Sequence, residues 1–147
     1  MSASTLPDLT MKKGECREVY LNLARFAKVG PRTMKAILGC AKWSSHLRAI
    51  NADIDDGNLR VQEALPRTIG PDKVEVWVSP LLVERASFDY MAEMVTVSDL
   101  TANDGTTPLR FREADLPKVD GDEKEMETKR KELAAIVAGL GPLFVYE

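Results

Sequence analysis

The spacing of apolar residues changes along the chain from the period of a helix to the period of a strand. Over residues 15–50 apolar side chains recur every three or four positions, as they do on one face of an α-helix. Over residues 73–79 they alternate strictly, which places Val74, Val76 and Val78 on one face of a strand. A domain with both periods must pack helices against a sheet. The sequence therefore predicts an α+β fold with a helical N-terminal half, a small, mostly antiparallel sheet, and a C-terminal helix followed by a terminal strand.

Length and composition predict one globular domain. The chain has 147 residues, 44% of them hydrophobic and 29% charged, which are ordinary values for a single domain. We divide it into an N-terminal arm (1–12), a helical part (13–68) and a sheet with the C-terminal helix (69–147). No run of 18 apolar residues is present, and the N-terminus lacks the pattern of a secretory signal. We therefore expect a cytoplasmic protein, or one in a virion assembled there, with no membrane contact.

Two helices and a break between them are predicted in the first half. The first helix covers residues 15–28, and Gly30 and Pro31 then interrupt it as a C-cap and as the first turn of the next helix. Residues 51–58 hold three Asp, two Asn and one Gly, and this composition predicts a loop after the second helix. A short helix over residues 59–65 is expected to follow that loop.

The middle of the chain is predicted to form the sheet. Residues 73–79 are its clearest strand, and residues 81–94 are ambiguous, with a helix as one solution. Further strands are predicted over residues 95–98 and 109–112. A turn is expected between them at residues 103–105, because Asn-Asp-Gly favours tight turns.

The last helix has a clear start signal. Asp122 is positioned to cap it, with Glu125 three residues later in capping-box spacing. The apolar residues 143–146 then predict a terminal strand. The helix residues expected to face the core, close to the three valines, are Leu133, Ile136, Val137 and Leu140.

Reactive groups are sparse in the sequence. Cys16 and Cys40 form no CxxC pair, and we expect two reduced, buried thiols rather than a disulfide. The one histidine, His46, lacks the surroundings of a catalytic triad or of a zinc site. A calcium-loop pattern beginning at Asn51 lacks the required Gly and Glu. The sequence thus predicts a non-enzymatic protein with no catalytic residue, metal or cofactor.

Residues 23–38 contain the most specific local pattern, LARFAKVGPRTMKAIL. A small residue, Ala24, lies in the first helix, and an apolar residue, Val29, lies at the turn. Met34 and Ile37 are the apolar residues of the second helix. This arrangement resembles the helix-turn-helix of bacterial and phage repressors.

The resemblance implies a nucleic-acid interface. It implies that Arg32, Thr33 and Lys35 begin a recognition helix, while Arg25 and Lys28 contact phosphates. The first third of the chain is positively charged and the rest is acidic, which agrees with an anionic partner for this part. The pattern departs from the family at Lys28, where repressors usually have Gly. The alternative is an ordinary helical hairpin whose basic face is solvated.

An assembly role is the function that the sequence favours. The apolar C-terminal run must be covered, and a terminal strand can pair with a sheet edge of its own domain or of a neighbouring copy. The N-terminal arm offers few apolar anchors, so we expect it to lie against a neighbouring chain and not against its own core. We therefore predict a structural subunit that binds copies of itself or other proteins, as in a phage-like or viral particle. The alternative is a helix-turn-helix nucleic-acid-binding protein. The predicted interface residues are Leu6, Leu9, Met11, Leu143, Phe144, Val145 and Tyr146.

Overall fold

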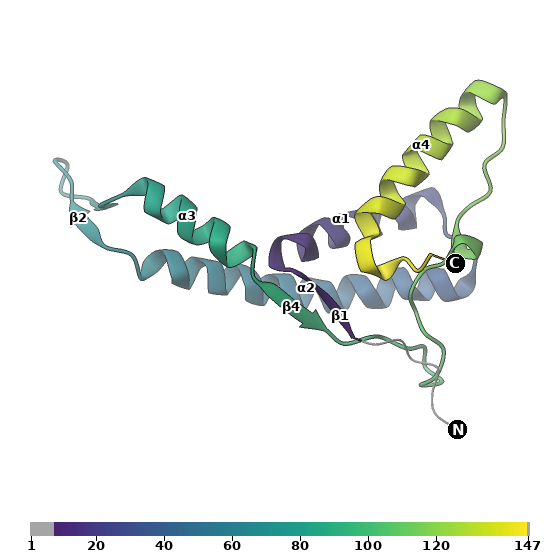
Figure 1. Ribbon diagram of the computed structural model, residues 1–147, viewed down its shortest axis with the longest axis horizontal. Helices are drawn as coiled ribbons and strands as arrows, with labels where there is room; N and C mark the ends of the chain where they lie inside the picture. The colour runs from purple at the N-terminus through teal and green to yellow at the C-terminus, as the bar shows by residue number, and fades with distance from the viewer. Residues whose placement is uncertain (1–7, 147) are drawn as a thin grey trace.

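Helix α2 (Met34–Glu63) is the longest element and runs through most of the molecule (Figure 1). The structure, a computed structural model, describes residues 8–146. Helix α1 (Lys13–Val29) lies alongside one end of α2, and α3 (Pro80–Met91) packs over the other end. Helix α4 (Glu123–Leu140) packs against α1 and projects away from α2. Across the described part of the chain, no helix is both long enough and apolar enough to cross a membrane.

Two small antiparallel sheets complete the predicted α+β fold. Strand β1 (Leu9–Lys12) pairs with β4 (Met94–Val97), which follows α3. Strands β2 (Arg67–Ile69) and β3 (Glu75–Trp77) form a separate hairpin between α2 and α3. The predicted strand at residues 95–98 is therefore confirmed with a shift of one residue, while the predicted single sheet is two separate sheets.

The predicted break between the first two helices is confirmed. Gly30 ends α1 with a φ of 95°, a conformation that favours glycine, and its N–H donates to the carbonyl of Phe26 at 3.2 Å. Thr33 then caps α2, because its hydroxyl accepts the N–H of Ala36 at 3.1 Å. The two helices consequently turn back on each other within four residues.

Helices α1 and α2 form an antiparallel hairpin. Asn51 of α2 donates a hydrogen bond to the carbonyl of Cys16 near the start of α1 (3.2 Å), and Arg17 forms an ion pair with Asp55 (2.9 Å). The loop predicted over residues 51–58 is therefore wrong, since α2 continues through it to Glu63. Asn, Asp and Gly have low helix propensity, but these contacts with α1 stabilise the helical conformation at this position.

The hydrophobic core lies where α1, the first half of α2, β1, β4 and the C-terminal region meet. Phe26 and Phe111 are fully buried and contact edge to face, with ring centroids 5.0 Å apart. Trp43 is fully buried, and its indole N–H donates to the carbonyl of Leu109 at 3.0 Å. The largest fully buried side chains are Trp43, Phe26, Phe111, Met11, Leu23, Leu47, Leu109, Leu140, Leu143, Val19, Val97 and Cys16.

The segment between β4 and α4 has little regular structure. The predicted turn is present, because Asp104 accepts the N–H groups of Thr106 and Thr107, both at 2.9 Å. The hydrogen bonds from Thr107, and then from Thr106, lower the pKa of the Asp104 carboxyl to about 2. The strand predicted over residues 109–112 is wrong, because these residues form only a single bridge. A 3₁₀ turn, η1 (Glu113–Asp115), follows them.

The start of α4 agrees with the prediction. Asp122 accepts the N–H of Glu125 at 2.8 Å, as expected of an N-cap. Ile136 and Leu140 are buried, and they face α1 rather than the predicted sheet. The expected packing of α4 against the valines of residues 74–78 is therefore wrong.

The C-terminal run returns to the core of its own chain. A 3₁₀ turn, η2 (Gly141–Leu143), ends α4, and Phe144 then forms a parallel bridge with Phe111. The Phe111 N–H donates to the carbonyl of Leu143, and the Val145 N–H donates to the carbonyl of Phe111, both at 2.8 Å. The predicted terminal strand is thus a single bridge, and it forms within the domain.

Of the strand predicted over residues 73–79, only the middle is a strand, β3 (Glu75–Trp77), and the alternating valines are not buried. Val74, Val76 and Val78 are 55%, 42% and 58% exposed. Their hairpin lies at the end of the molecule farthest from α4 (Figure 1). The alternation therefore predicted a strand at the right place but too long, and the assumption that its apolar face is covered within the chain is wrong.

Candidate interaction surface

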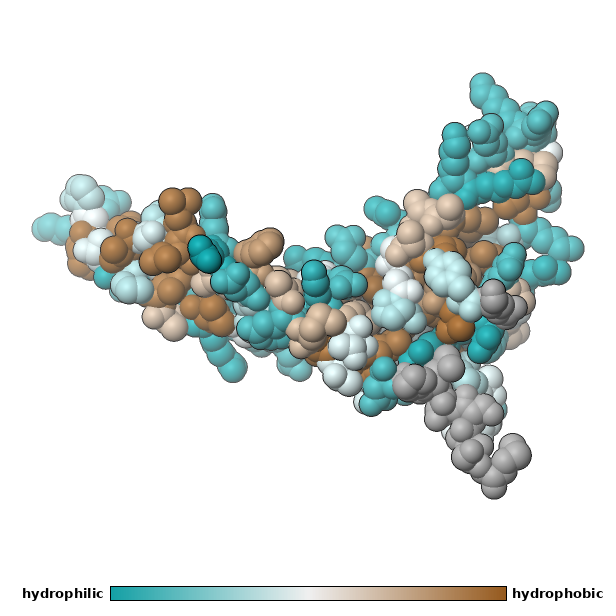
Figure 2. All heavy atoms as spheres, viewed as in Figure 1, coloured by the Kyte–Doolittle hydropathy of each residue, from teal (hydrophilic) through white to brown (hydrophobic). Residues whose placement is uncertain are grey.

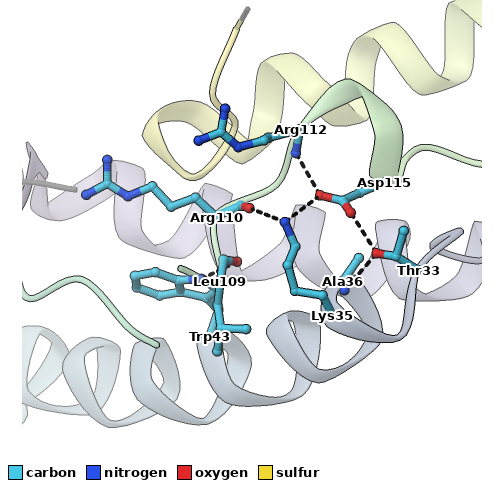
Figure 3. Close-up of polar contacts among 8 residues, drawn as sticks. All are labelled: Thr33, Lys35, Ala36, Trp43, Leu109, Arg110, Arg112 and Asp115. Atoms are coloured by element: carbon cyan, nitrogen blue, oxygen red, sulfur yellow. Dashed lines mark hydrogen bonds and ion pairs between the residues drawn. The ribbon is translucent and has the colours of Figure 1, made fainter. Parts of the chain in front are cut away.

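Two residues predicted to contact nucleic acid belong instead to a polar network around the buried Asp115 (Figure 3). The Thr33 hydroxyl donates to one carboxylate oxygen of Asp115 at 2.6 Å. The Lys35 ammonium lies 3.3 Å from the other oxygen and donates to the carbonyl of Arg110 at 3.4 Å. The backbone N–H of Arg112 also donates to Asp115, at 2.8 Å. This network attaches the segment around η1 to the start of α2.

A second buried ion pair supports the same segment. The Arg110 guanidinium donates to the Asp99 carboxylate at 3.1 Å, and both side chains are almost fully buried. Buried charges are tolerated when they are paired and hydrogen-bonded. These groups therefore hold the irregular segment in one position against α2.

The helix-turn-helix geometry is not formed. Met34 and Ile37, which the motif requires inside, are 79% and 48% exposed. The two helices are antiparallel, whereas helix-turn-helix pairs cross at about 90–120°. Arg25, Lys28 and Arg32 are exposed on the surface. The alternative interpretation, an ordinary helical hairpin with a solvated basic face, agrees with this arrangement.

Most of the predicted interface residues lie in the core of the same chain. Leu9, Met11, Leu143 and Phe144 are at most 7% exposed. The expectation that the N-terminal arm avoids its own core is therefore wrong for Leu9 and Met11, which β1 carries into the core through its pairing with β4.

The remaining predicted interface residues lie near the surface or are not described. Val145 is half-buried, and Tyr146 is 72% exposed with its ring against Phe144. Both line an open groove of about 370 Å³ between the C-terminal run and α4. Leu6 lies outside the described residues.

At the other end of the molecule, many large apolar side chains are exposed to solvent. We call residues 55–93 the extension; it comprises the end of α2, the β2–β3 hairpin and α3. No residue from 55 to 96 is buried. Hydrophobic residues, brown in Figure 2, continue along the extension to its tip. Its exposed large apolar side chains are Leu59, Ile69, Val74, Val76, Val78, Leu81, Leu82 and Phe88.

Close packing and cation–π contacts hold the extension together. A Cβ on Gly57 of α2 would lie within van der Waals radii of the Tyr90 hydroxyl, so α3 approaches α2 closely at this glycine. The Lys13 ammonium lies 3.6 Å from the centre of the Tyr90 ring, and Arg67 lies 4.2 Å from the Trp77 ring. These contacts cover only one face of α3.

The sequence contains a signal for this surface that the predicted interface does not include. Residues 81–83 are three consecutive apolar residues, and Ala86, Phe88 and Tyr90 continue the pattern. In a helix these positions cover two faces, and a helix that is apolar on two faces is covered on both sides. Tyr90 contacts α2 at Gly57 and Val83 is half-buried, while Leu81 and Phe88 are exposed.

The two cysteines and the histidine pack among other side chains of the chain. Cys16 and Cys40 are free and buried, as predicted. Burial raises the pKa of the Cys40 thiol to about 11, with a contribution from the charge of Asp115, and burial also raises the pKa of Cys16. His46 is half-buried beside the Trp43 ring. Within residues 8–146 no group of three or more His, Cys, Asp or Glu side chains is arranged to hold a metal ion.

Comparisons with protein-family models, curated proteins and solved structures find no match to this chain.

Proposed function

We propose that this protein is a non-enzymatic assembly subunit that binds a protein surface through its extension. The observation that carries the proposal is that no residue of α3, a helix of 12 residues, is fully buried, although Tyr90 and Met91 pack partly against the core. Isolated helices of this length are marginal in water, and most helices in proteins are stabilised by burying an apolar face. An additional protein surface over α3 would supply that burial.

The side chains on the exposed side of α3 support the same proposal. Single exposed apolar residues are ordinary, but large contiguous patches rimmed by charges mark interaction sites. On α3, Leu81 and Phe88 are 76% and 74% exposed, and Glu84, Arg85 and Asp89 lie beside them. An apolar centre with a charged rim is the usual anatomy of a protein interface.

The contacts that hold the base of the extension in place also support the proposal. The half of α2 that precedes the extension is tied to the rest of the chain by Trp43, Lys35 and the hairpin with α1. A helix that is anchored at one end and apolar at the other presents a preformed surface, which lowers the entropic cost of binding. A subunit with this design fits a repeating assembly, such as a phage-like or viral particle.

Photo-cross-linking tests the proposal in the cells that produce the protein. A photoreactive phenylalanine analogue at position 88 is expected to give a discrete adduct with a protein, either another copy or a different chain. The same analogue at position 131, an exposed site on α4, is the matched control and should give none. Purified partner should then bind the wild type and fail to bind Leu81→Asp. Absence of any protein adduct at position 88, or equal adducts at both positions, overturns the proposal.

A further inference from the structure

The C-terminal run has one paired edge and one open edge. It is extended at Phe144, and the Leu143 carbonyl and the Val145 N–H are both hydrogen-bonded to the backbone of Phe111. Successive residues of an extended chain direct their backbone groups to opposite edges, so Phe144 and Tyr146 direct theirs away from Phe111. Within residues 8–146 neither the Phe144 carbonyl nor the Tyr146 N–H forms a hydrogen bond. The open edge therefore offers one acceptor and one donor to another strand.

The apolar groove beside this run follows its edge. Phe144, Val145 and Tyr146 all line the groove, together with Leu133 and Val137 of α4. Alternate residues of an extended run point to opposite faces, so a groove lined by three consecutive residues borders an edge as well as a face. Its volume of about 370 Å³ lies within the range of ligand-binding clefts. The groove can therefore hold side chains of a segment that pairs with the run.

The rim of the groove is mainly cationic. Arg130 lines the groove itself, and a second depression, which shares Leu133 with it, continues to Arg32 and Lys118. All three cations are exposed, and none forms an ion pair within the part of the chain that the structure describes. Among the described residues Glu113 is the one carboxylate that lines these two depressions. Three cations against one carboxylate favour an acidic ligand.

The charges of the adjoining surface leave this excess in place. A third depression between α1, α4 and the segment after η1 is lined by Lys129 and Glu132, whose charges offset each other, and again by Lys118. Phosphates of a nucleic acid would match the cations alone. The apolar groove and the open strand edge match a peptide better, because main-chain hydrogen bonds and pockets for alternate side chains are the two parts of strand addition.

We infer that this groove binds an extended, acidic segment of a different protein, which adds as a strand to the open edge of the C-terminal run. The segment pairs with the Phe144 carbonyl and the Tyr146 N–H. Its alternate apolar side chains enter the groove, and the acidic side chains between them face Arg130 and the neighbouring cations. The acidic stretches of this chain at residues 53–56 and 123–127 belong to α2 and α4, so a second copy does not supply the segment from them. The inference is independent of the proposed function, which concerns the opposite end of the molecule (Figure 1).

Fluorescence anisotropy of the purified full chain tests the inference with a labelled peptide of about eight residues in which valine and glutamate alternate. We expect saturable binding that weakens as salt is added, and a Kd at least about tenfold lower than that of the matching valine–lysine peptide. N-methylation of all valines, or of all glutamates, blocks one edge of the peptide each. One of these two methylated peptides should lose binding at least about tenfold and the other should keep it, because a strand pairs through one edge here.

Exposed residues of α4 provide matched variants that leave the core untouched. Ala134 lines the groove and Ala135 does not, although both are exposed. Ala134→Trp fills the groove and should abolish binding of the valine–glutamate peptide, whereas Ala135→Trp should leave the Kd unchanged. Arg130→Glu should raise the Kd about fivefold, and Lys131→Glu, the control for a charge change, should not.

Four results would overturn the inference. They are no saturable binding of the valine–glutamate peptide, equal binding of the valine–lysine peptide, unchanged binding by Ala134→Trp, and tighter binding of labelled single-stranded DNA than of the peptide. Leu81→Asp, in the extension, should bind the peptide as the wild type does. Loss of peptide binding in that variant would place the peptide on the extension and also exclude the groove, while cross-linking at position 88 tests the proposed function separately.

Discussion

The body of the molecule and its extension are built from the same helix, yet they satisfy their apolar residues differently. In the body, which comprises residues 8–54 and 94–146, three helices and two strands enclose fully buried side chains such as Trp43 and Phe111. In the extension, α3 packs along α2 and a two-stranded hairpin lies beyond the end of α2 (Figure 1), and both leave apolar side chains exposed. The body covers most of its large apolar side chains, while the extension leaves many of them exposed.

The polar contacts differ in the same way. The body buries its ionic groups, as with Asp115 and with the pair of Asp99 and Arg110. The ion pair between Arg67 and Glu75 in the extension is exposed, at 3.6 Å, and contributes about 0–1 kcal/mol at most. Buried networks require one arrangement, because every member must keep its partners. The conformation of the body is therefore defined by more internal contacts than that of the extension.

Amide hydrogen exchange should give the largest contrast between the two regions. We expect the amides of α1 around Leu23 to exchange only through global unfolding, and those of α3 to exchange through local opening, hundreds-fold faster or more. Addition of a purified binding partner should protect α3 alone, because the partner covers it. Mass spectrometry with and without the partner measures both effects. Equal protection of the two helices without the partner would contradict the comparison.

Truncation of one phenylalanine in each region gives the next largest effect. Phe26→Ala removes a fully buried ring and should lower the free energy of unfolding by about 3–5 kcal/mol. Phe88→Ala removes a ring that is 74% exposed and should change the stability of the monomer by less than about 0.5 kcal/mol. Urea denaturation followed by circular dichroism compares them. A large loss in the monomeric Phe88 variant would mean that the extension has a core of its own.

The buried carboxylate of the body should matter less than its aromatic core but more than any surface charge. Asp115→Ala leaves Lys35, the Thr33 hydroxyl and a backbone N–H without their acceptor, and should cost about 2–4 kcal/mol. Asp120→Ala is the control, since Asp120 is 92% exposed and 3.8 Å from Lys129. Thermal denaturation of both variants is the measurement, and equal melting temperatures would show that the network contributes little.

The smallest expected effect is a dependence of stability on alkaline pH. The Cys40 thiol has an ordinary pKa of 9.0, and its pKa in the folded chain is about 11. Above pH 9 the thiol ionises in the unfolded chain but not in the folded one, so the free energy of unfolding falls as the pH rises towards 11. Between pH 8 and pH 10 this amounts to about 1 kcal/mol. Cys40→Ala should flatten the slope in urea denaturation series, and an unchanged slope would assign it to other groups.

Local signals in the sequence predicted two helix boundaries of the body. The end of α1 at Gly30 and the cap of α4 at Asp122 depend on residues within one turn of each other, and both are present as expected. The free, buried thiols were also predictable from composition and spacing. These features need little information from distant parts of the chain.

Features that depend on distant contacts were not predictable from the sequence. Residues 51–58 have loop-forming composition, and only contacts with Arg17, Cys16 and Tyr90 explain why they stay helical. The burial of Leu143 and Phe144 likewise depends on their pairing with Phe111. Lys35 belongs to a basic pattern in the sequence, but Asp115, 80 positions later, determines its surroundings. The alternation of the valines predicts a strand with one apolar face and one polar face, but it carries no information on what covers the apolar face.

Helix α2 passes from the body into the extension without interruption. The number of residues in α2 therefore determines the direction in which the extension points. Each residue of an α-helix adds about 100° of rotation and 1.5 Å of rise. One residue inserted between Ile54 and Gly57 would turn the extension by about 100° around the axis of α2 and aim Phe88 at a different side of the molecule. Seven inserted residues would restore the direction to within about 20° while moving the extension outward by about 10 Å. Related chains that keep the same binding direction should therefore differ in this stretch by whole numbers of turns, whatever their surface residues are.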